Sequence, residues 1–87
     1  MRLELFHRID DRGSAAVRRR LTALRLEGRV TFRNVHFDSH REALEQLGGA
    51  QVPAIFDGAS LVSGESDCCA RLERLAQDSN GIDGGMS

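Results

Sequence analysis

The residues of this chain best suited to bind a ligand lie in two short stretches, Val52-Pro53 and Glu65-Ser66. An X-Pro bond is the one kind of peptide bond that takes the cis form at modest cost. A cis bond here would turn the backbone N–H and C=O of Val52 outward, where they can pair with an extended ligand as an added strand does. Glu65 and Ser66 open a predicted helix, whose free backbone N–H groups favour a bound carboxylate. The alternative is that Pro53 is architectural and that a serine, Ser63 or Ser66, only caps the helix.

Cysteine and histidine side chains are the other candidates for chemistry. Cys68 and Cys69 fall in a predicted helix, where neighbouring side chains point about 100° apart, so they should not form a disulfide with each other. We expect both to be reduced thiols that pack in the core. His7 lies in a polar stretch beside two aspartates, as an exposed loop imidazole or as a proton donor or acceptor. The two cysteines and three histidines match no zinc spacing, and no metal site is predicted.

The periodicity of apolar residues predicts the elements that position these side chains. Two-residue alternation and β-branched or aromatic runs indicate strands, whereas a spacing of three and four residues indicates helices. The predicted strands cover residues 3–6, 30–37, 54–56 and 60–62, and the predicted helices cover residues 14–27, 39–47 and 65–76. Their order is β-α-β-α-β-β-α.

Short local signals mark where several of these elements end. Gly28 is expected to end the first helix. Ser14 is either the N-cap of that helix or a hydroxyl available to a ligand. The sequence Ser39-His40-Arg41-Glu42 has the form of a capping box for the second helix. Asp57-Gly58 predicts a hairpin between the last two strands.

Two details of the pattern leave alternatives open. The apolar phase of the second strand slips between Phe32 and Val35, which indicates either a bulge or a sheet covered on both faces. In the last helix the inward stripe, centred on Leu72, contains either Cys69 and Ala76 or Cys68 and Leu75. We expect the stripe, with either membership, to pack on the sheet.

The order of the elements predicts how they assemble. Right-handed crossovers make the first two strands parallel, and the hairpin adds an antiparallel pair. The expected fold is therefore α/β, a four-stranded mixed sheet with helices on both faces, formed by one domain over residues 1–77. Residues 78–87 are rich in Gly, Ser and Asp and are expected to form a disordered tail.

Composition narrows the function classes. Eighty-seven residues allow one domain, and a net charge of −1 with mixed signs argues against a nucleic-acid partner. The run Arg18-Arg19-Arg20 is interpreted as a solvated helix face. All 12 basic residues are Arg, which is consistent with a GC-rich bacterial genome. Without an apolar run long enough to span a membrane, or the apolar core of a signal peptide, we expect a cytoplasmic location and no membrane partner.

The stretch from Val52 to Ser66 also carries a resemblance. Its Val-Pro, apolar strand, turn, second strand and Glu-Ser at a helix start resemble the thioredoxin-fold superfamily, in particular the glutathione transferase amino-terminal domain and glutaredoxin-like proteins. The predicted element order is the minimal thioredoxin-like arrangement. In that superfamily a Cys-x-x-Cys motif carries the dithiol chemistry, and the matching positions 11–14 here contain no cysteine. The resemblance therefore implies a domain without dithiol oxidoreductase activity.

The same resemblance implies glutathione as a ligand. The Val52 backbone, set by Pro53, would bind the cysteinyl part, Glu65 would take the γ-glutamyl ammonium, and Ser66 with the helix N–H groups would take its carboxylate. Ser14 would hydrogen-bond the thiolate, as transferase hydroxyls do. No cofactor other than glutathione is implied.

Three functions follow as hypotheses. The leading one is a small domain that binds glutathione or a related thiol. The alternative is a non-catalytic adaptor or dimerisation module that binds a protein partner through the proline edge or the arginine-bearing first helix. A thiol enzyme that uses Ser14 or an exposed Cys68 is the third, so enzymatic activity stays open.

Overall fold

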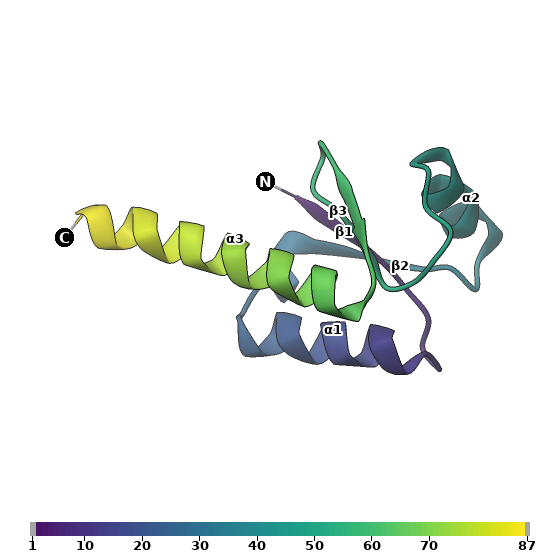
Figure 1. Cartoon of the computed structure of the whole chain (residues 1–87), viewed down its shortest axis with the longest axis horizontal. Helices are drawn as coiled ribbons and strands as arrows, with labels where there is room; N and C mark the ends of the chain where they lie inside the picture. Colours follow the sequence, from purple (N-terminus) through teal and green to yellow (C-terminus); the bar gives the residue numbers. More distant parts are fainter. Residues whose placement is uncertain (1, 87) are drawn as a thin grey trace.

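The computed structural model describes the backbone of residues 2–86 and the side chains of residues 2–77 (Figure 1). Within this range the chain is a mixed α/β protein whose helices and strands follow the predicted order. The elements are β1 (Leu3–His7), α1 (Arg12–Ala23), the 3-10 turn η1 (Glu27–Arg29), β2 (Val30–Asn34), α2 (Asp38–Gln46), β3 (Ala54–Phe56), β4 (Leu61–Ser63) and α3 (Glu65–Met86).

The four strands form one mixed sheet in the order β2-β1-β3-β4. β1 runs parallel to β2, with Leu5 opposite Phe32, and antiparallel to β3, with Leu5 also opposite Ile55. β3 and β4 form the predicted antiparallel hairpin, in which Ile55 lies opposite Val62. The amino-terminal strand β1 is therefore a central strand, hydrogen-bonded on both sides.

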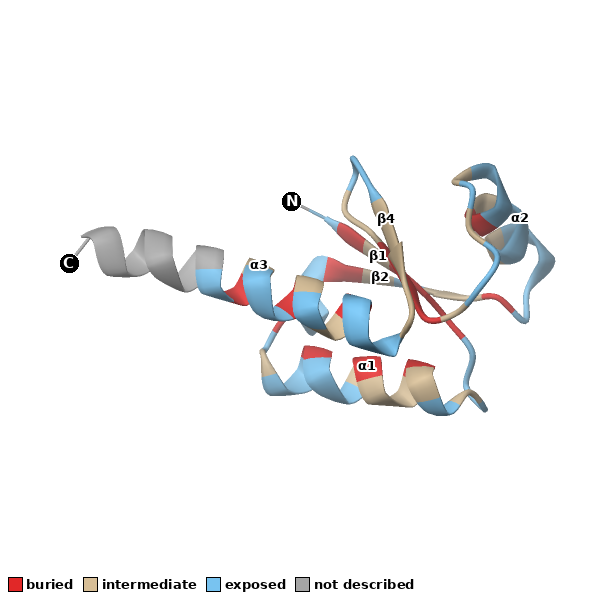
Figure 2. Ribbon diagram, viewed as in Figure 1, coloured by how far each residue is buried: buried red, intermediate tan, exposed pale blue. Residues whose placement is uncertain are grey.

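Helices cover both faces of this sheet. α1 and α3 pack on one face and α2 packs on the other, so each face has its own core, and Figure 2 shows buried residues on the inner sides of α1 and α3. The first core, under α1 and α3, contains Leu3, Leu5, Val17, Leu21, Leu26, Val30, Ile55, Cys68, Leu72 and Ala76. The second core, under α2, contains Phe6, Val35, Leu44 and Ala54.

α1 begins and ends at residues other than those predicted. Its N-cap is Asp11, whose carboxylate accepts the backbone N–H of Ser14 at 2.7 Å, so the assignment of Ser14 as the cap was wrong. The helix ends at Ala23 and not at Gly28, because Arg25 takes the left-handed conformation with φ 57°. Leu26 then turns back into the first core.

The phase slip in the second strand comes from both faces being covered. The β1–β2 register runs without interruption to Asn34, so there is no bulge. Val30 packs in the first core, and Val35, just after the strand, packs in the second core. The predicted capping box was also wrong, since α2 begins at Asp38 and its N-cap, Phe37, makes no side-chain hydrogen bond.

The inner face of α3 combines members of both predicted stripes. Cys68, Leu72 and Ala76 are buried at a spacing of four residues, and Cys69 and Leu75 pack partly against them. The helix continues past its predicted end, to Met86. The side chains of residues 78–87 lie outside the described residues, and the disordered tail stays a prediction.

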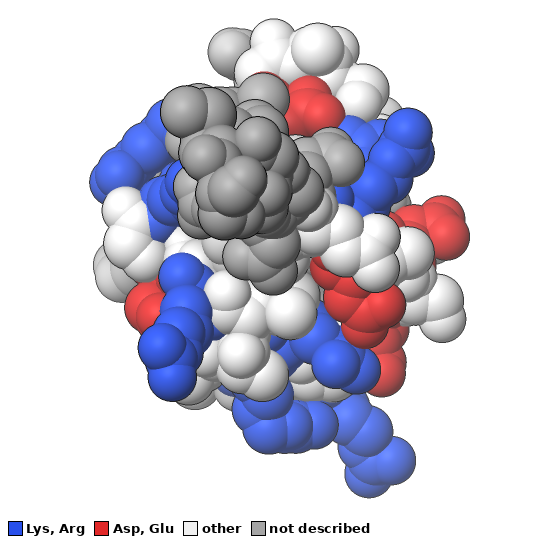
Figure 3. Space-filling model, turned by 90° about the vertical axis from the view of Figure 1, so that its left-hand side faces the viewer, with Lys and Arg blue, Asp and Glu red and all other residues white. Residues whose placement is uncertain are grey.

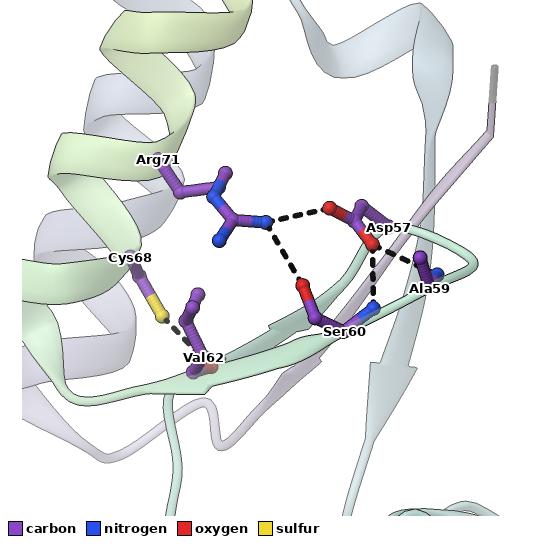
Figure 4. A network of polar contacts seen from close by, with 6 residues as sticks. All are labelled: Asp57, Ala59, Ser60, Val62, Cys68 and Arg71. Atoms are coloured by element: carbon purple, nitrogen blue, oxygen red, sulfur yellow. Dashed lines mark hydrogen bonds and ion pairs between the residues drawn. The ribbon is translucent and has the colours of Figure 1, made fainter.

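An ion pair links the β3–β4 hairpin to α3 (Figure 4). The Asp57 carboxylate accepts the backbone N–H groups of Ala59 and Ser60 at 2.9 and 2.8 Å, and its other oxygen pairs with Arg71. These backbone hydrogen bonds, followed by the charge of Arg71, hold the pKa of Asp57 below its ordinary value. The hairpin turn is thereby fixed to the helix.

Charges of both signs are spread over the surface. Figure 3 shows arginine side chains at several places on the face drawn, with acidic groups between them. Among the described residues, no helix has the length and apolar character needed to cross a membrane.

Candidate functional site

Three segments that are far apart in the sequence meet at Gly13. A Cβ added to Gly13 would lie 3.2 Å from Pro53 Cδ and 3.7 Å from Glu65 Cβ. The N–H of Gly64 donates to the Pro53 carbonyl oxygen at 2.9 Å, which joins the proline to the start of α3. The first turn of α1, the Val52-Pro53 stretch and the first turn of α3 therefore form one surface. The Val52-Pro53 peptide bond is cis.

The start of α3 offers unused polar groups at this surface. Glu65 and Ser66 are both exposed, and neither side chain has a hydrogen-bond or ion-pair partner within residues 2–77. The first N–H groups of a helix also lack intrahelical partners. The capping alternative is not supported, because the hydroxyl groups of Ser63 and Ser66 make no hydrogen bond in this part of the chain.

Val52 and Pro53 differ in exposure. Val52 is half-buried, and its backbone makes no hydrogen bond within the described residues, so its N–H and C=O remain open to a ligand. Pro53 is buried against Gly13, and its carbonyl accepts from Gly64. The proline shapes the surface, and Val52 supplies its polar backbone.

Ser14 lies in the first turn of α1 but is not part of the exposed surface. Its side chain has 0% exposure, and its Oγ accepts the backbone N–H of Arg8 at 3.1 Å. A fully buried hydroxyl is not presented to a ligand in this conformation. Ser14 therefore acts by ordering residues 8–14, beside Gly13.

His7 is the site residue that the sequence analysis misplaced. It is the last residue of β1 and is only 5% exposed, so the prediction of a loop residue was wrong. The signal was present in the alternation of Leu3, Leu5 and His7, which place their side chains on one face of the strand. Its Nδ1 accepts a hydrogen bond from Arg18 Nη1 at 3.0 Å, because guanidinium groups only donate.

Burial, followed by the positive charge of Arg18 and the effect of His40, lowers the pKa of His7. Arg18 also donates to the carbonyl oxygens of Arg8 at 3.0 Å and Ile9 at 3.4 Å. The interpretation of Arg18-Arg19-Arg20 as a solvated face thus fits Arg19 and Arg20, which are exposed, and fails for Arg18. Arg18 fixes the β1–α1 loop to the end of β1.

The two cysteines are free thiols in different environments. The prediction that Cys68 packs in the core is confirmed by its 0% exposure. Its thiol donates to the carbonyl oxygens of Pro53 at 3.5 Å and Val62 at 3.6 Å, and burial raises its pKa to about 12. Cys69 is half-buried and lines a groove of about 350 Å³ between α1 and α3, together with Glu65.

A second hollow, of about 330 Å³, lies where β1 and β2 end. It is lined by Arg8, Ile9, Asp10, Asn34 and His36. Among the described residues, no group of His, Cys, Asp and Glu side chains is arranged to hold a metal ion. The polar and charged side chains that line this hollow are suited to bind polar or ionic groups.

No protein-family model, curated protein or solved structure matches this chain. The surface around Gly13 is where an open backbone, a helix start and polar side chains without a partner among residues 2–77 come together.

Proposed function

We propose that this chain is a thioredoxin-like domain that binds glutathione or a related thiol and performs no dithiol chemistry. The observation that carries the proposal is the meeting of the start of α1, Val52-Pro53 and the start of α3 at Gly13. These are the segments whose motifs resemble the glutathione transferase amino-terminal domain. The element order and the mixed sheet are consistent with the same fold.

Each part of glutathione has a group suited to it on this surface. The γ-glutamyl carboxylate accepts from the Ser66 hydroxyl and from the first N–H groups of α3, where the helix dipole favours negative charge. The γ-glutamyl ammonium pairs with the unpartnered Glu65 carboxylate. The cysteinyl part, an extended peptide unit, pairs with the open backbone N–H and C=O of Val52.

The placement of the thiols supports binding without dithiol exchange. Residues 11–14, at the start of α1, contain no cysteine, and Cys68 is buried with a pKa raised to about 12. The thiolate is the nucleophile in disulfide exchange, so Cys68 is unreactive at neutral pH. We therefore place this domain among binding proteins.

The test is a titration of the full chain with reduced and with oxidised glutathione at millimolar concentration, followed by amide NMR signals. We expect shifts at Val52, Glu65 and Ser66 and at Gly13 between them. The variant Gly13→Val should weaken binding at least about tenfold, since its side chain would press on Pro53 and Glu65.

Two matched controls belong to this titration. Gly28→Val introduces the same side chain at a glycine with nothing within 4 Å of an added Cβ, and it should bind as the parent chain does. Asp38→Asn removes a carboxylate at the start of α2 and should also have no effect. Unmoved signals at Val52, Glu65 and Ser66 would contradict the proposal.

A protein-binding module is the second candidate, and a different observation favours it. The exposed large apolar side chains among the described residues are Ile9 at 66%, Phe37 at 58% and Phe32 at 43%. All three belong to β2 or to the segments that follow β1 and β2. Such groups mark interaction surfaces when they gather.

This candidate predicts self-association that depends on the apolar side chains. Sedimentation of the chain over a hundredfold range of concentration should show a rising average mass, and the double variant Phe32→Ser, Phe37→Ser should stay monomeric. A constant monomer mass in both proteins would exclude the homodimer, and glutathione should not alter the result.

A further inference from the structure

One guanidinium, that of Arg18, joins the β1–α1 loop to the end of β1 through three hydrogen bonds. Arg18 Nη1 donates to His7 Nδ1 at 3.0 Å and to the Arg8 carbonyl at 3.0 Å, while Nη2 donates to the Ile9 carbonyl at 3.4 Å. We call these three contacts the Arg18 bridge. One of the three acceptors, His7 Nδ1, can no longer accept a hydrogen bond once the imidazole takes up a proton.

His7 is surrounded by groups that oppose a positive charge. From α1 it faces Arg18, and from α2 it faces His40, whose own Nδ1 accepts from Arg33 Nη1 at 3.2 Å. From β2 the Phe32 ring packs against the imidazole, with the two rings nearly perpendicular and their centroids 5.8 Å apart. The charged and titratable groups that act on His7 are thus basic, and none of them is a carboxylate to stabilise an imidazolium.

We propose that His7 is a pH sensor whose protonation breaks the Arg18 bridge, releases the loop over residues 8–11 and weakens the ligand site. The proton comes from solvent and binds Nδ1. In the neutral imidazole that accepts from Arg18, Nε2 carries the hydrogen and Nδ1 does not. Nδ1–H and the guanidinium are then two donors and two positive charges at contact distance, so they separate. The inference rests on the proposed function for its last step only.

Hydrogen bonds connect the loop to the surface around Gly13. Arg8 donates its N–H to Ser14 Oγ at 3.1 Å, and its carbonyl accepts from Asp11 N–H at 3.4 Å as well as from Arg18. Asp11 caps α1, and Gly13 packs on Pro53 and Glu65. Releasing the Arg8 carbonyl therefore loosens one wall of the ligand site.

The pH at which this happens follows from the direction of the shift. The pKa of His7 in the folded chain lies below 6.5, so the bridge is intact at neutral pH and is lost as the pH falls below that value. The folded state binds fewer protons than the unfolded state in this window. Stability therefore also falls as the pH drops through it.

The experiment follows the amide and imidazole NMR signals of the full chain from about pH 8 to about pH 5, without glutathione. We expect Arg8, Ile9 and Asp10 to shift together with the His7 ring, at one midpoint below 6.5. At neutral pH the His7 ring should carry its proton on Nε2. Repeating the titration with glutathione should show its affinity falling about tenfold across the same midpoint.

Three variants separate the sensor from general acid effects. His7→Asn keeps an acceptor oxygen in the place of Nδ1 but does not titrate, so the loop signals should become independent of pH. Arg18→Met should give the acid-like loop signals already at neutral pH. His36→Asn, which removes another histidine, should leave the response unchanged.

The outcomes distinguish the two proposals. Loop signals that keep titrating in His7→Asn, or that do not follow the His7 ring in the parent chain, overturn the sensor. A loop that titrates as expected while glutathione binds at no pH leaves the sensor in place and overturns the proposed ligand.

Discussion

Replacing Phe6 with alanine lowers the free energy of unfolding by about 3–5 kcal/mol. Phe6 has 0% exposure at the middle of the sheet, where it packs with Val35, Leu44 and Ala54 in the second core. The ring is fully enclosed, so its removal takes apolar surface out of the core and leaves a cavity that the neighbours fill only in part. The measurement is urea unfolding followed by far-UV circular dichroism.

The expected loss is large for a domain of this size. Small domains have a total stability of about 5–15 kcal/mol, so the variant should unfold at a much lower urea concentration. The matched control is Phe37→Ala, which removes the same side chain from a position that is 58% exposed and should change stability by less than about 0.5 kcal/mol. Equal effects of the two substitutions would show that α2 does not close a core over Phe6.

Cys68 should react with a thiol reagent at least about a thousandfold more slowly than Cys69 in the folded chain. The pKa of Cys68 is raised from 9.0 to about 12, so the fraction of thiolate falls by about three powers of ten at a given pH. Cys69 is half-buried and lies on the groove between α1 and α3. The measurement is the labelling rate of Cys69→Ser, which leaves Cys68, against that of Cys68→Ala, which leaves Cys69.

Both variants should be labelled at similar rates in denaturant, where the environment of the two thiols is the same. That comparison shows that folding, and not the reagent, causes the difference. If Cys68 is modified in the native chain as fast as Cys69, the packing of α3 against β3 and β4 described above is incorrect, and a reactive Cys68 has to be reconsidered.

The parts of the fold that are set by residues close together in the sequence were predictable. The Asp57-Gly58 pair marks a hairpin because its turn geometry is set by those two residues, and the hairpin is present. Apolar alternation located every strand to within a few residues. The order of the elements, with the rule for crossovers, was enough to predict the mixed sheet.

Predictions failed at the boundaries of two helices. Ser39 and Glu42 have the spacing of a capping box, but Phe37 lies at the N-cap of α2. Arg25 takes a left-handed conformation that glycine adopts more readily, and Leu26 is thereby directed into the first core. For the end of α1 the tertiary position of an apolar side chain, Leu26, decides the boundary, whereas Phe37 is exposed and its packing does not explain the start of α2.

The candidate site was predictable in part for the same reason. Val52-Pro53 and Glu65-Ser66 were selected from their residue types and from their resemblance to a known arrangement. The roles of Ser14 and His7 were not, because each is determined by a partner in another segment: Arg8 for the first and Arg18 for the second. No local pattern marked Gly13 as a site residue. Its place in the site comes from the approach of Pro53 and Glu65.

The first core takes residues from Leu3 to Ala76, so its members span nearly all of the described chain. A ribosome that has released only β1, α1 and β2 holds a half-sheet whose face is still open to water. The layer closes when α3 emerges and adds Cys68 and Leu72 to it. We therefore expect this core to form in one cooperative step, and fragments that end before α3 are expected not to fold on their own.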